Sequence, residues 1–369
     1  MKITNIKTFY LKEKNIDART DSSQDALLVK IETDNGIEGW GEVDGCPSVT
    51  NAIINAPFSH TLVNGLKNII VNENPLEIEY LWNKMYESTL YFGRSGAVIQ
   101  AMAGIDIALW DIKGKYLKLP IYQLLGGPFK RKLRVYSSNM FQYTIEDTIE
   151  RVKIALDTGH TGVKFGWEPF GLNESKDLLY VEAIRKALGE NDFMLDVGLI
   201  WDAKTTIKRS KQYEPFNLFW IEEPLHPDNY TGYGELSNNC VQHIAAGEEE
   251  CTLRGFKQLI DVGKINIAQI DVTRCGITQA MKIANYANLC GIKVCNHNFT
   301  TDINSSASLH FLCSIPNSLV MEYCNENGEI SRKLSKNPVK IIDGYAHLPE
   351  EPGLGVQPDH EIIEKYIVN

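Results

Sequence analysis

Residues 218–222 read LFWIE and residues 243–248 read HIAAGE, and these two stretches decide the fold. Each is a short apolar run that ends in a carboxylate, and the two carboxylates, Glu222 and Glu248, are 26 residues apart. That interval is about the length of one strand, one helix and their two loops in a parallel α/β unit. The pair therefore predicts two successive strands of a parallel sheet, each with an acidic residue at its end.

Six further runs of the same kind flank these two stretches. Short, mostly apolar runs are typical of strands that are buried on both faces of a parallel sheet. Stretches with apolar residues at helical spacing lie between them, most clearly residues 145–158, 176–188 and 278–290. Eight alternating strand and helix signals predict an α/β protein with a closed, (β/α)8-type TIM barrel. The six runs are residues 133–139, 162–167, 193–197, 265–271, 293–297 and 319–323.

Charged residues follow the same spacing. Seven of them close these runs, at steps of 32, 26, 26, 23, 26 and 25 residues. They are Lys164, Asp196, Glu222, Glu248, Asp271, His297 and Glu322. In a (β/α)8 barrel the ends of the strands surround one face, and the active site is built there. We therefore expect these seven side chains, although they are far apart in sequence, to converge on one pocket.

The first 127 residues follow another pattern. Residues 3–11 alternate like a strand, and two strand-like runs flank Asp34-Asn35-Gly36, a strong signal for a β-hairpin. Helical patterns follow, most clearly in residues 96–115, and residues 126–128 (GGP) then break the chain before the first barrel strand. These signals predict a separate α+β domain that precedes the barrel.

Bulk composition limits the classes of function. The chain has 369 residues, of which 43% are hydrophobic, and a formal net charge of −10. Its Lys and Arg residues are scattered, which argues against a nucleic-acid partner, and no apolar run approaches the ~18 residues of a membrane span. The eight cysteines form no CxxC pair, and residues 1–5 lead directly into a strand-like run. We therefore expect a reduced, cytoplasmic protein without membrane contact.

Asp196, Glu222 and Glu248 end three successive strands. Three carboxylates at one point would repel each other strongly unless a cation bound them. Oxygen-only ligands favour Mg2+, whereas zinc would normally recruit His or Cys. One such carboxylate is usually the cap of the following helix, but three at matched spacing predict a metal site. Because strand side chains alternate, only one of Glu222 and its neighbour Glu223 should point inward, and the sequence does not say which.

His297 and Asp271 end adjacent strands. A carboxylate beside an imidazole fixes its tautomer and raises its basicity, so the pair predicts a general base that works near neutral pH. Lys164 is expected across the ring from His297. There it would act as a base, hold a substrate carboxylate, or form salt bridges to the metal carboxylates. Glu322 would donate a hydrogen bond to a substrate oxygen if protonated, or orient other groups.

At this point nearly the whole chain resembles the mandelate racemase branch of the enolase superfamily. The likeness is carried by IDIALWDIKGK (105–115), by WIEEP around Glu222, by AAGEE around Glu248 and by the pair of Asp271 and His297. The spacing of the three metal carboxylates is also similar to that of the family. The combination of these motifs is highly specific.

The resemblance implies a division of the chain and a mechanism. Residues 1–127 would form an α+β capping domain, residues 128–340 the catalytic barrel, and residues 341–369 a C-terminal segment that returns to the capping domain. Mg2+ on the three carboxylates would bind a substrate carboxylate, and a base would remove the proton from the adjacent carbon. Members of this superfamily are known to use a Lys or His base with Mg2+ that stabilises an enediolate.

The chain departs from the family pattern in three places. The family's second strand often reads Lys-x-Lys, but residues 164–166 read KFG and lack the second Lys. The metal-binding Asp is often followed by x-Asn, but residues 197–198 read VG, and residues 275–277 (CGI) are one glycine short. Racemisation is best served by two opposed groups, whereas dehydration can run with His297 alone, first as base and then as acid. The missing Lys therefore favours dehydration.

We therefore expect an Mg2+-dependent lyase that dehydrates a sugar acid, an aldonate or aldarate, to its 2-keto-3-deoxy acid. The alternative is a racemase, epimerase or cycloisomerase that acts on a related carboxylate, with Lys164 as the second base. A third possibility is a barrel that still binds metal but has lost catalysis. Barrels of this kind commonly associate, so a homo-oligomer is expected. The polar segment 14–25 favours a plain surface loop over a lid on the barrel mouth.

Overall fold

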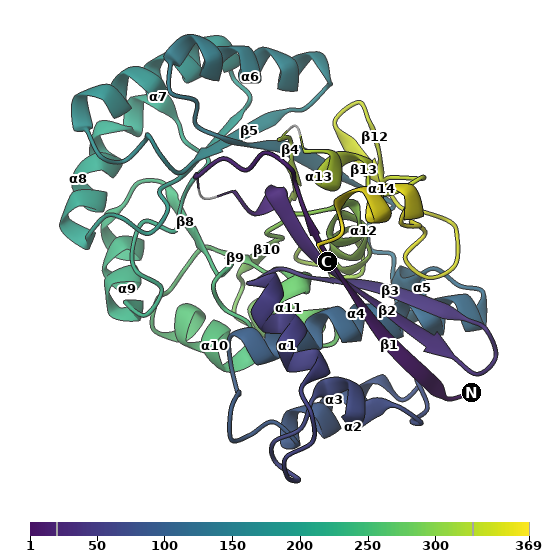
Figure 1. Ribbon diagram of the computed structural model, residues 1–369. Coiled ribbons are helices and arrows are strands. Elements are labelled where there is room, and N and C mark those ends of the chain that lie inside the picture. Colours follow the sequence, from purple (N-terminus) through teal and green to yellow (C-terminus); the bar gives the residue numbers. More distant parts are fainter. Residues whose placement is uncertain (20, 327, 369) are drawn as a thin grey trace.

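Eight parallel strands form the centre of the computed structural model, which describes residues 1–19, 21–326 and 328–368 (Figure 1). Each predicted run overlaps one of them, and the observed strands begin and end within two residues of the prediction. They are β4 (Lys132–Met140), β5 (Gly162–Gly166), β6 (Asp192–Asp196), β7 (Trp220–Glu222), β8 (His243–Ala246), β9 (Ile267–Gln269), β10 (Lys293–Cys295) and β11 (Met321–Cys324).

The strands form a ring. Successive strands pair in parallel from β4 to β10, and β11 pairs with β4. The remaining gap is closed by a parallel bridge between Val294 and Ser318. There the Val294 N–H donates to the Asn317 carbonyl at 3.0 Å, and the Leu319 N–H donates to the Val294 carbonyl at 2.8 Å. The predicted (β/α)8-type barrel is therefore confirmed.

Seven helices connect successive strands and surround the ring (Figure 1). A Thr, Asn or Asp side chain caps the start of each one by accepting a hydrogen bond from a backbone N–H of its first turn. Such caps satisfy backbone donors that the helix itself leaves unpaired. The helices are α6 (Ile145–Asp157), α7 (Glu174–Leu188), α8 (Ala203–Gln212), α9 (Tyr230–Asn239), α10 (Leu253–Asp261), α11 (Val272–Leu289) and α12 (Asp302–Cys313).

The N-terminal unit is an antiparallel sheet covered by helices. Its strands follow the order β1 (Ile3–Lys12), β2 (Asp25–Thr33) and β3 (Glu38–Val43), and the predicted hairpin turn joins β2 to β3. In Figure 1 these strands lie against the barrel on the side of β10 and α11. The helices are α1 (Pro47–Asn55), α2 (Leu66–Ile70), α3 (Ile78–Glu87), α4 (Ala97–Leu117) and α5 (Ile121–Leu124).

Two aspartates of α4, Asp106 and Asp111, bind segments outside this unit. Asp106 accepts hydrogen bonds from the Thr278 N–H at 2.9 Å and from its hydroxyl at 2.5 Å, and Thr278 belongs to the barrel helix α11. Gly276 interrupts α11 with φ +79°, and a Cβ atom there would lie 2.9 Å from Oδ2 of Asp106. A glycine is therefore required at the contact between the two units.

The C-terminal segment touches both units. The hairpin of β12 (Lys340–Ile342) and β13 (Tyr345–His347) pairs with the start of β4, so the predicted boundary after residue 340 falls inside a strand of the barrel sheet. Beyond it, the Leu354 N–H donates to Asp111 of α4 at 2.9 Å, and the Val368 N–H donates to the Tyr10 carbonyl of β1 at 2.8 Å. Two short helices flank the hairpin, α13 (Glu329–Lys333) before it and α14 (His360–Tyr366) after it.

None of the helices in the part of the chain that the structure describes is long and apolar enough to cross a membrane.

Candidate active site

Three carboxylates meet at the carboxyl ends of the central strands. Asp196 ends β6, Glu222 ends β7, and Glu248 lies two residues beyond the end of β8. One oxygen of each lies within 4.8 Å of one oxygen of the other two, and all three side chains are buried. The structure therefore brings together the three residues that the sequence predicts as metal ligands.

Lys164 lies among these carboxylates. It occupies the middle of β5 rather than its end. Its Nζ contacts Oε1 of Glu222 and lies 3.6 Å from Oδ2 of Asp196 and 2.7 Å from Oε1 of Glu322. Burial lowers the pKa of Lys164, but the surrounding carboxylates, Glu222 above all, raise it well beyond its ordinary value. Lys164 is therefore held as an ammonium ion.

Glu222 and Glu223 are both buried but make different contacts. Glu222 faces Lys164, and its Oε2 accepts a hydrogen bond from Nε1 of Trp220 at 2.8 Å. Glu223 is also buried, but its carboxylate accepts from the Gly247 N–H at 3.0 Å. The expectation that only one of them points inward is wrong. Glu223 lies beyond the end of β7 with φ +36°, where the alternation of a strand no longer applies.

The carboxylate cluster fits a hard cation. Burial, together with Asp196 and Glu322, raises the pKa of Glu222 to about 8 against the opposing effect of Lys164. Within the residues that the structure describes, Oε2 of Glu248 is buried without a hydrogen-bond donor. Buried carboxylates that repel one another, with one oxygen left unpartnered, match the ligand preferences of Mg2+. Asp196, Glu222 and Glu248 would hold the ion.

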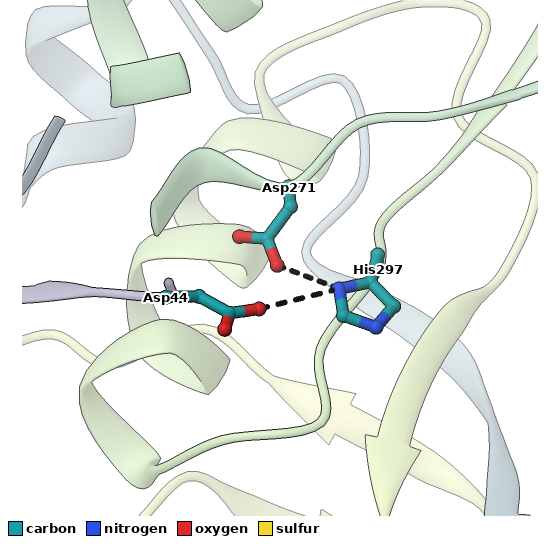
Figure 2. A group of neighbouring side chains, drawn as sticks. All are labelled: Asp44, Asp271 and His297. Carbon is teal, nitrogen blue, oxygen red and sulfur yellow. Dashed lines mark hydrogen bonds and ion pairs between the residues drawn. The ribbon is translucent and has the colours of Figure 1, made fainter. Parts of the chain in front are cut away.

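His297 lies beside this cluster, between two carboxylates (Figure 2). Its Nδ1 is 2.7 Å from Oδ2 of Asp271 and 3.8 Å from Oδ2 of Asp44. Asp271 also caps α11, because its Oδ1 accepts from the N–H and the hydroxyl of Thr273 at 2.7 and 2.5 Å. Donation from Nδ1 to Asp271 leaves Nε2 on the side of Glu248, whose Oε2 lies 3.7 Å away.

The surroundings of His297 make it a strong base. Burial lowers its pKa, but Glu248 and the hydrogen bond to Asp271 raise it to about 10. The same contact lowers the pKa of Asp271, against the raising effect of its burial. A cation on Glu248 would offset the largest of the effects that raise the pKa of His297, and would bring it toward the neutral range.

Glu322 is ionised in this arrangement. Burial raises its pKa, but Lys164 and His297 lower it more, and the result lies below its ordinary value. Its Oε2 accepts from the Asn298 N–H at 2.7 Å. Of the two roles considered for Glu322, orientation of neighbouring groups agrees with this charge, whereas donation to substrate does not.

A cavity of about 110 Å³ opens above these residues and is lined by Lys164, Asp196, Glu248 and His297. Ser22 of the capping domain also lines it, and its hydroxyl donates to the Phe299 carbonyl at 3.4 Å. The expectation that residues 14–25 form a plain surface loop is therefore wrong, because this segment reaches the barrel mouth.

Two charged residues of the site were missed. Arg274 lines the cavity, and Asp44 of the capping domain binds it through Nε at 2.9 Å. Arg274 has a signal in the sequence, since it follows Asp271 by three residues and so lies in the first turn of the next helix. Asp44 has none, because its place depends on how the capping domain docks onto the barrel.

The departures from the family pattern have a structural counterpart. A Cβ atom on Gly166 would lie 2.8 Å from Oδ2 of Asp196, so the carboxylate occupies the space beside the position of the missing second Lys. The Gly198 N–H donates to Oδ1 of Asp196 at 2.9 Å. A backbone donor therefore orients this metal-ligand candidate at the place where the family often has an Asn side chain.

Fold and site together define a capped (β/α)8 barrel whose strand ends combine a cluster of three carboxylates with an imidazole. Residues 6–126 match the mandelate racemase / muconate lactonizing enzyme N-terminal domain, and residues 147–362 match the enolase C-terminal domain-like family. The chain belongs to the enolase superfamily, in its mandelate racemase branch.

Relatives of this chain carry several activities. L-rhamnonate dehydratase of Saccharopolyspora erythraea is 31% identical over 351 residues, which cover 91% of this chain and 84% of that protein. The crystal structure of 3,6-anhydro-D-galactonate cycloisomerase from Zobellia galactanivorans has a TM-score of 0.91 and 31% identity, with both chains fully covered. A racemase from Streptomyces coelicolor A3(2) with bound magnesium has a TM-score of 0.88 and 26% identity, covering 99% of this chain and all of that one.

Proposed function

We propose that this chain is an Mg2+-dependent dehydratase of a sugar acid, with Asp196, Glu222 and Glu248 as metal ligands and His297 as the acid–base residue. One observation carries the proposal. Nε2 of His297 faces the proposed metal ligands, 3.7 Å from Oε2 of Glu248, while Nδ1 is 2.7 Å from Oδ2 of Asp271. Lys164 contacts three carboxylates, two of which are proposed metal ligands, and Gly166 stands where a second Lys would serve as the opposed base.

When bound, Mg2+ supplies positive charge for the substrate carboxylate and for the negative charge that develops on it after proton loss. Nε2 of His297 takes the proton from C2 of the sugar acid, and the electron pair of that bond enters the carboxylate to give an enediolate. Return of this pair expels the hydroxyl from C3, which leaves as water with the proton from His297. The resulting enol gains a proton at C3 and becomes the 2-keto-3-deoxy acid.

The other residues hold charges in place. Asp271 keeps Nδ1 of His297 protonated and thus keeps Nε2 free to accept. Lys164 balances two metal carboxylates and Glu322, and its ammonium would also stabilise negative charge on the substrate carboxylate. Ser22 and its segment cover the mouth, which would limit the access of water during proton transfer.

A cycloisomerase or racemase is the second candidate. It is favoured by the close similarity to the cycloisomerase of Zobellia galactanivorans, whose structure matches this chain over its full length. Both reactions begin with the same removal of the α-proton. They differ in the later steps, because a dehydratase must expel the β-hydroxyl, whereas a racemase returns the proton to the opposite face.

The test is a panel of sugar acids incubated with the protein and Mg2+ in D2O. We expect 2-keto acid to form from one stereochemical group of sugar acids. His297→Asn should form no 2-keto acid, and its affinity for Mg2+ should be unchanged. If the substrate gains deuterium at C2 but no keto acid forms, the reaction is that of a racemase or cycloisomerase and not a dehydration. Binding of acids without either product would indicate a barrel that has lost catalysis. The control is His243→Asn, because His243 is exposed and begins β8, at the end of the barrel opposite the three carboxylates.

A further inference from the structure

One side of the active-site cavity is apolar. Met140 ends β4, Trp167 follows β5, and Phe299 lies four residues beyond β10, and all three line the cavity. Met140 and Phe299 form a small apolar cluster with Cys324 at the end of β11, and Trp167 packs against it. These residues belong to neighbouring strands in the ring. We call Met140, Trp167 and Phe299 the apolar wall.

Two members of the apolar wall lie across the ring from the cation site. Met140 on β4 and Phe299 after β10 are separated from Glu222 on β7 and Glu248 on β8. Trp167, in contrast, follows β5, next to Asp196 on β6. A sugar acid that places its carboxylate on the cation and its C2 proton beside His297 extends across the cavity. Its far carbon atoms then approach the apolar wall.

The cavity offers no spare positive charge for a second carboxylate. Its cationic side chains among the described lining residues are Lys164, Arg274 and His297. Lys164 contacts three carboxylates. Arg274 pairs with Asp44 at 2.9 Å and with Glu249 at 3.4 Å, and it also donates to the Glu248 carbonyl at 2.8 Å. A carboxylate at the far end of the substrate would therefore meet acidic neighbours and an apolar surface.

Polar groups on this side are few and partly engaged. Asn139 lines the cavity, but its amide donates to the Ser137 carbonyl at 3.0 Å and to the Ser137 hydroxyl at 3.1 Å. Ser138 is the remaining polar side chain contributed by β4, and its hydroxyl has no hydrogen-bond partner among the described residues, but it lies opposite Lys164, two residues before Met140. A terminal hydroxyl that is buried without a hydrogen-bond partner loses binding energy, whereas a methyl group gains it.

We propose that the apolar wall selects monocarboxylic sugar acids with an apolar far end, namely 6-deoxyaldonates, over aldonates and aldarates of the same configuration. This inference rests on the proposed function, since it takes the same site and the same orientation of the substrate. Met140, Trp167 and Phe299 are the residues that determine the preference.

Two matched series test the preference. Each series has three acids of one configuration, which end in a methyl, a hydroxymethyl and a carboxylate group, in that order. The first series is L-rhamnonate, L-mannonate and L-mannarate. The second is D-fuconate, D-galactonate and galactarate. In the series whose configuration the site accepts, we expect kcat/KM to fall by about tenfold or more from methyl to hydroxymethyl. It should fall further to the carboxylate. Equal values, or a higher value for the hydroxymethyl or carboxylate acid, would overturn the proposal.

The same series separate failure of this inference from failure of the proposed function. If none of the six acids yields keto acid, dehydration of these acids is excluded, and calorimetric binding in the presence of Mg2+ ranks them instead. Tightest binding by the methyl-ended member supports the wall as a specificity element. Tightest binding by L-mannarate or galactarate refutes it, whatever the reaction catalysed.

Substitutions in the apolar wall test whether it causes the preference for methyl-ended acids. Met140→Arg adds a cation on the apolar side, and we expect the ratio of methyl to carboxylate activity to fall by about tenfold or more. Phe299→Ser should reduce the same ratio by removing apolar surface. The control is Val241→Arg, which places the same charge before β8, at the opposite end of the barrel, where Val241 is 57% exposed. A ratio that stays unchanged in folded Met140→Arg and Phe299→Ser would contradict the assignment.

Discussion

Arg274 of the barrel donates a hydrogen bond from Nε to Oδ2 of Asp44 in the capping domain, at 2.9 Å. The same guanidinium donates to the carbonyl of Glu248 at 2.8 Å, and Asp44 lies 3.8 Å from Nδ1 of His297 (Figure 2). One ion pair thus joins the capping domain to the loop of a metal-ligand candidate and to the imidazole. Docking of the two units and assembly of the site are therefore linked.

Asp44→Asn should weaken this link. The side chains of Asp44 and Arg274 are only 6% and 13% exposed, and loss of one member of a buried pair leaves the other charge uncompensated. We expect the free energy of unfolding to fall by about 3 kcal/mol, measured by urea denaturation. The control is Glu249→Gln, whose carboxylate is 38% exposed and 3.4 Å from Arg274, with an expected loss below about 1 kcal/mol. Similar losses in the two variants would argue against the ion pair as the link.

Asp271→Asn should slow proton transfer without removing the metal. The amide no longer holds the tautomer of His297, so we expect kcat for deuterium uptake at C2 to fall by about 10²- to 10⁴-fold. Calorimetry should give unchanged Mg2+ affinity, because Asp271 is not among the proposed ligands. Asp44, Asp271 and His297 also lie close enough to hold a cation. A loss of Mg2+ affinity in Asp271→Asn would therefore indicate that the ion binds to Asp44, Asp271 and His297 instead.

Mg2+ should stabilise the folded protein through the three strand-end carboxylates. At 100 times the dissociation constant, binding to the folded state alone adds about 2.7 kcal/mol, which a thermal shift measures. Glu222→Gln should abolish this shift. Glu223→Gln should retain it, although Glu223, Glu248 and Glu249 form a second acidic group. The reverse pattern of shifts would place the ion among those three residues.

The barrel was readable from the sequence because each strand is local, and each ends near a charged residue. Alternating runs fix the order of strands and helices, and a closed ring then brings Asp196, Glu222 and Glu248 to one face. The same logic places His297 beside Asp271. These are consequences of topology, and they need no knowledge of side-chain conformation.

Other features depend on geometry that no local pattern encodes. Glu223 is buried because φ turns positive just after β7, and Asp44 reaches His297 only because the capping domain docks where it does. Lys164 lies in the middle of β5, and its length lets it reach Glu322 on β11. Ser22 reaches the mouth through a single contact, its hydrogen bond to the Phe299 carbonyl. A polar, unpatterned segment gives no signal for such contacts.

Gly166→Ala should weaken Mg2+ binding, because position 166, where the family often has a second Lys, has no room for a side chain. Its Cβ would meet Oδ2 of Asp196 at 2.8 Å and Cγ at 2.9 Å, so the carboxylate must move. We expect Mg2+ affinity to fall by about 10- to 100-fold, measured by calorimetry. Gly189→Ala is the control for backbone effects, since a Cβ there meets no atom within 4 Å. Unchanged Mg2+ affinity in Gly166→Ala would show that Asp196 has room to shift.

His310 should make the protein less stable in acid. It is fully buried on α12, its Nδ1 accepts from the Tyr122 N–H at 3.3 Å, and its Nε2 lies 3.0 Å from the Leu354 carbonyl. Burial lowers its pKa to about 4, against a raising effect of the Leu354 carbonyl.

An unfolded His titrates near pH ~6.5, so His310 is neutral in both states above that pH. As the pH falls from there through the folded pKa, the unfolded state binds the extra proton, and about 3 kcal/mol of stability is lost. Urea unfolding between pH 7 and 4 should therefore show a smaller decline for His310→Gln than for the wild type. Buried carboxylates such as Glu42, whose pKa is raised to about 8, act with the opposite sign but equally in both proteins. His226→Gln, exposed to solvent, should keep the wild-type slope, and a parallel decline in His310→Gln would assign the acid sensitivity to other groups.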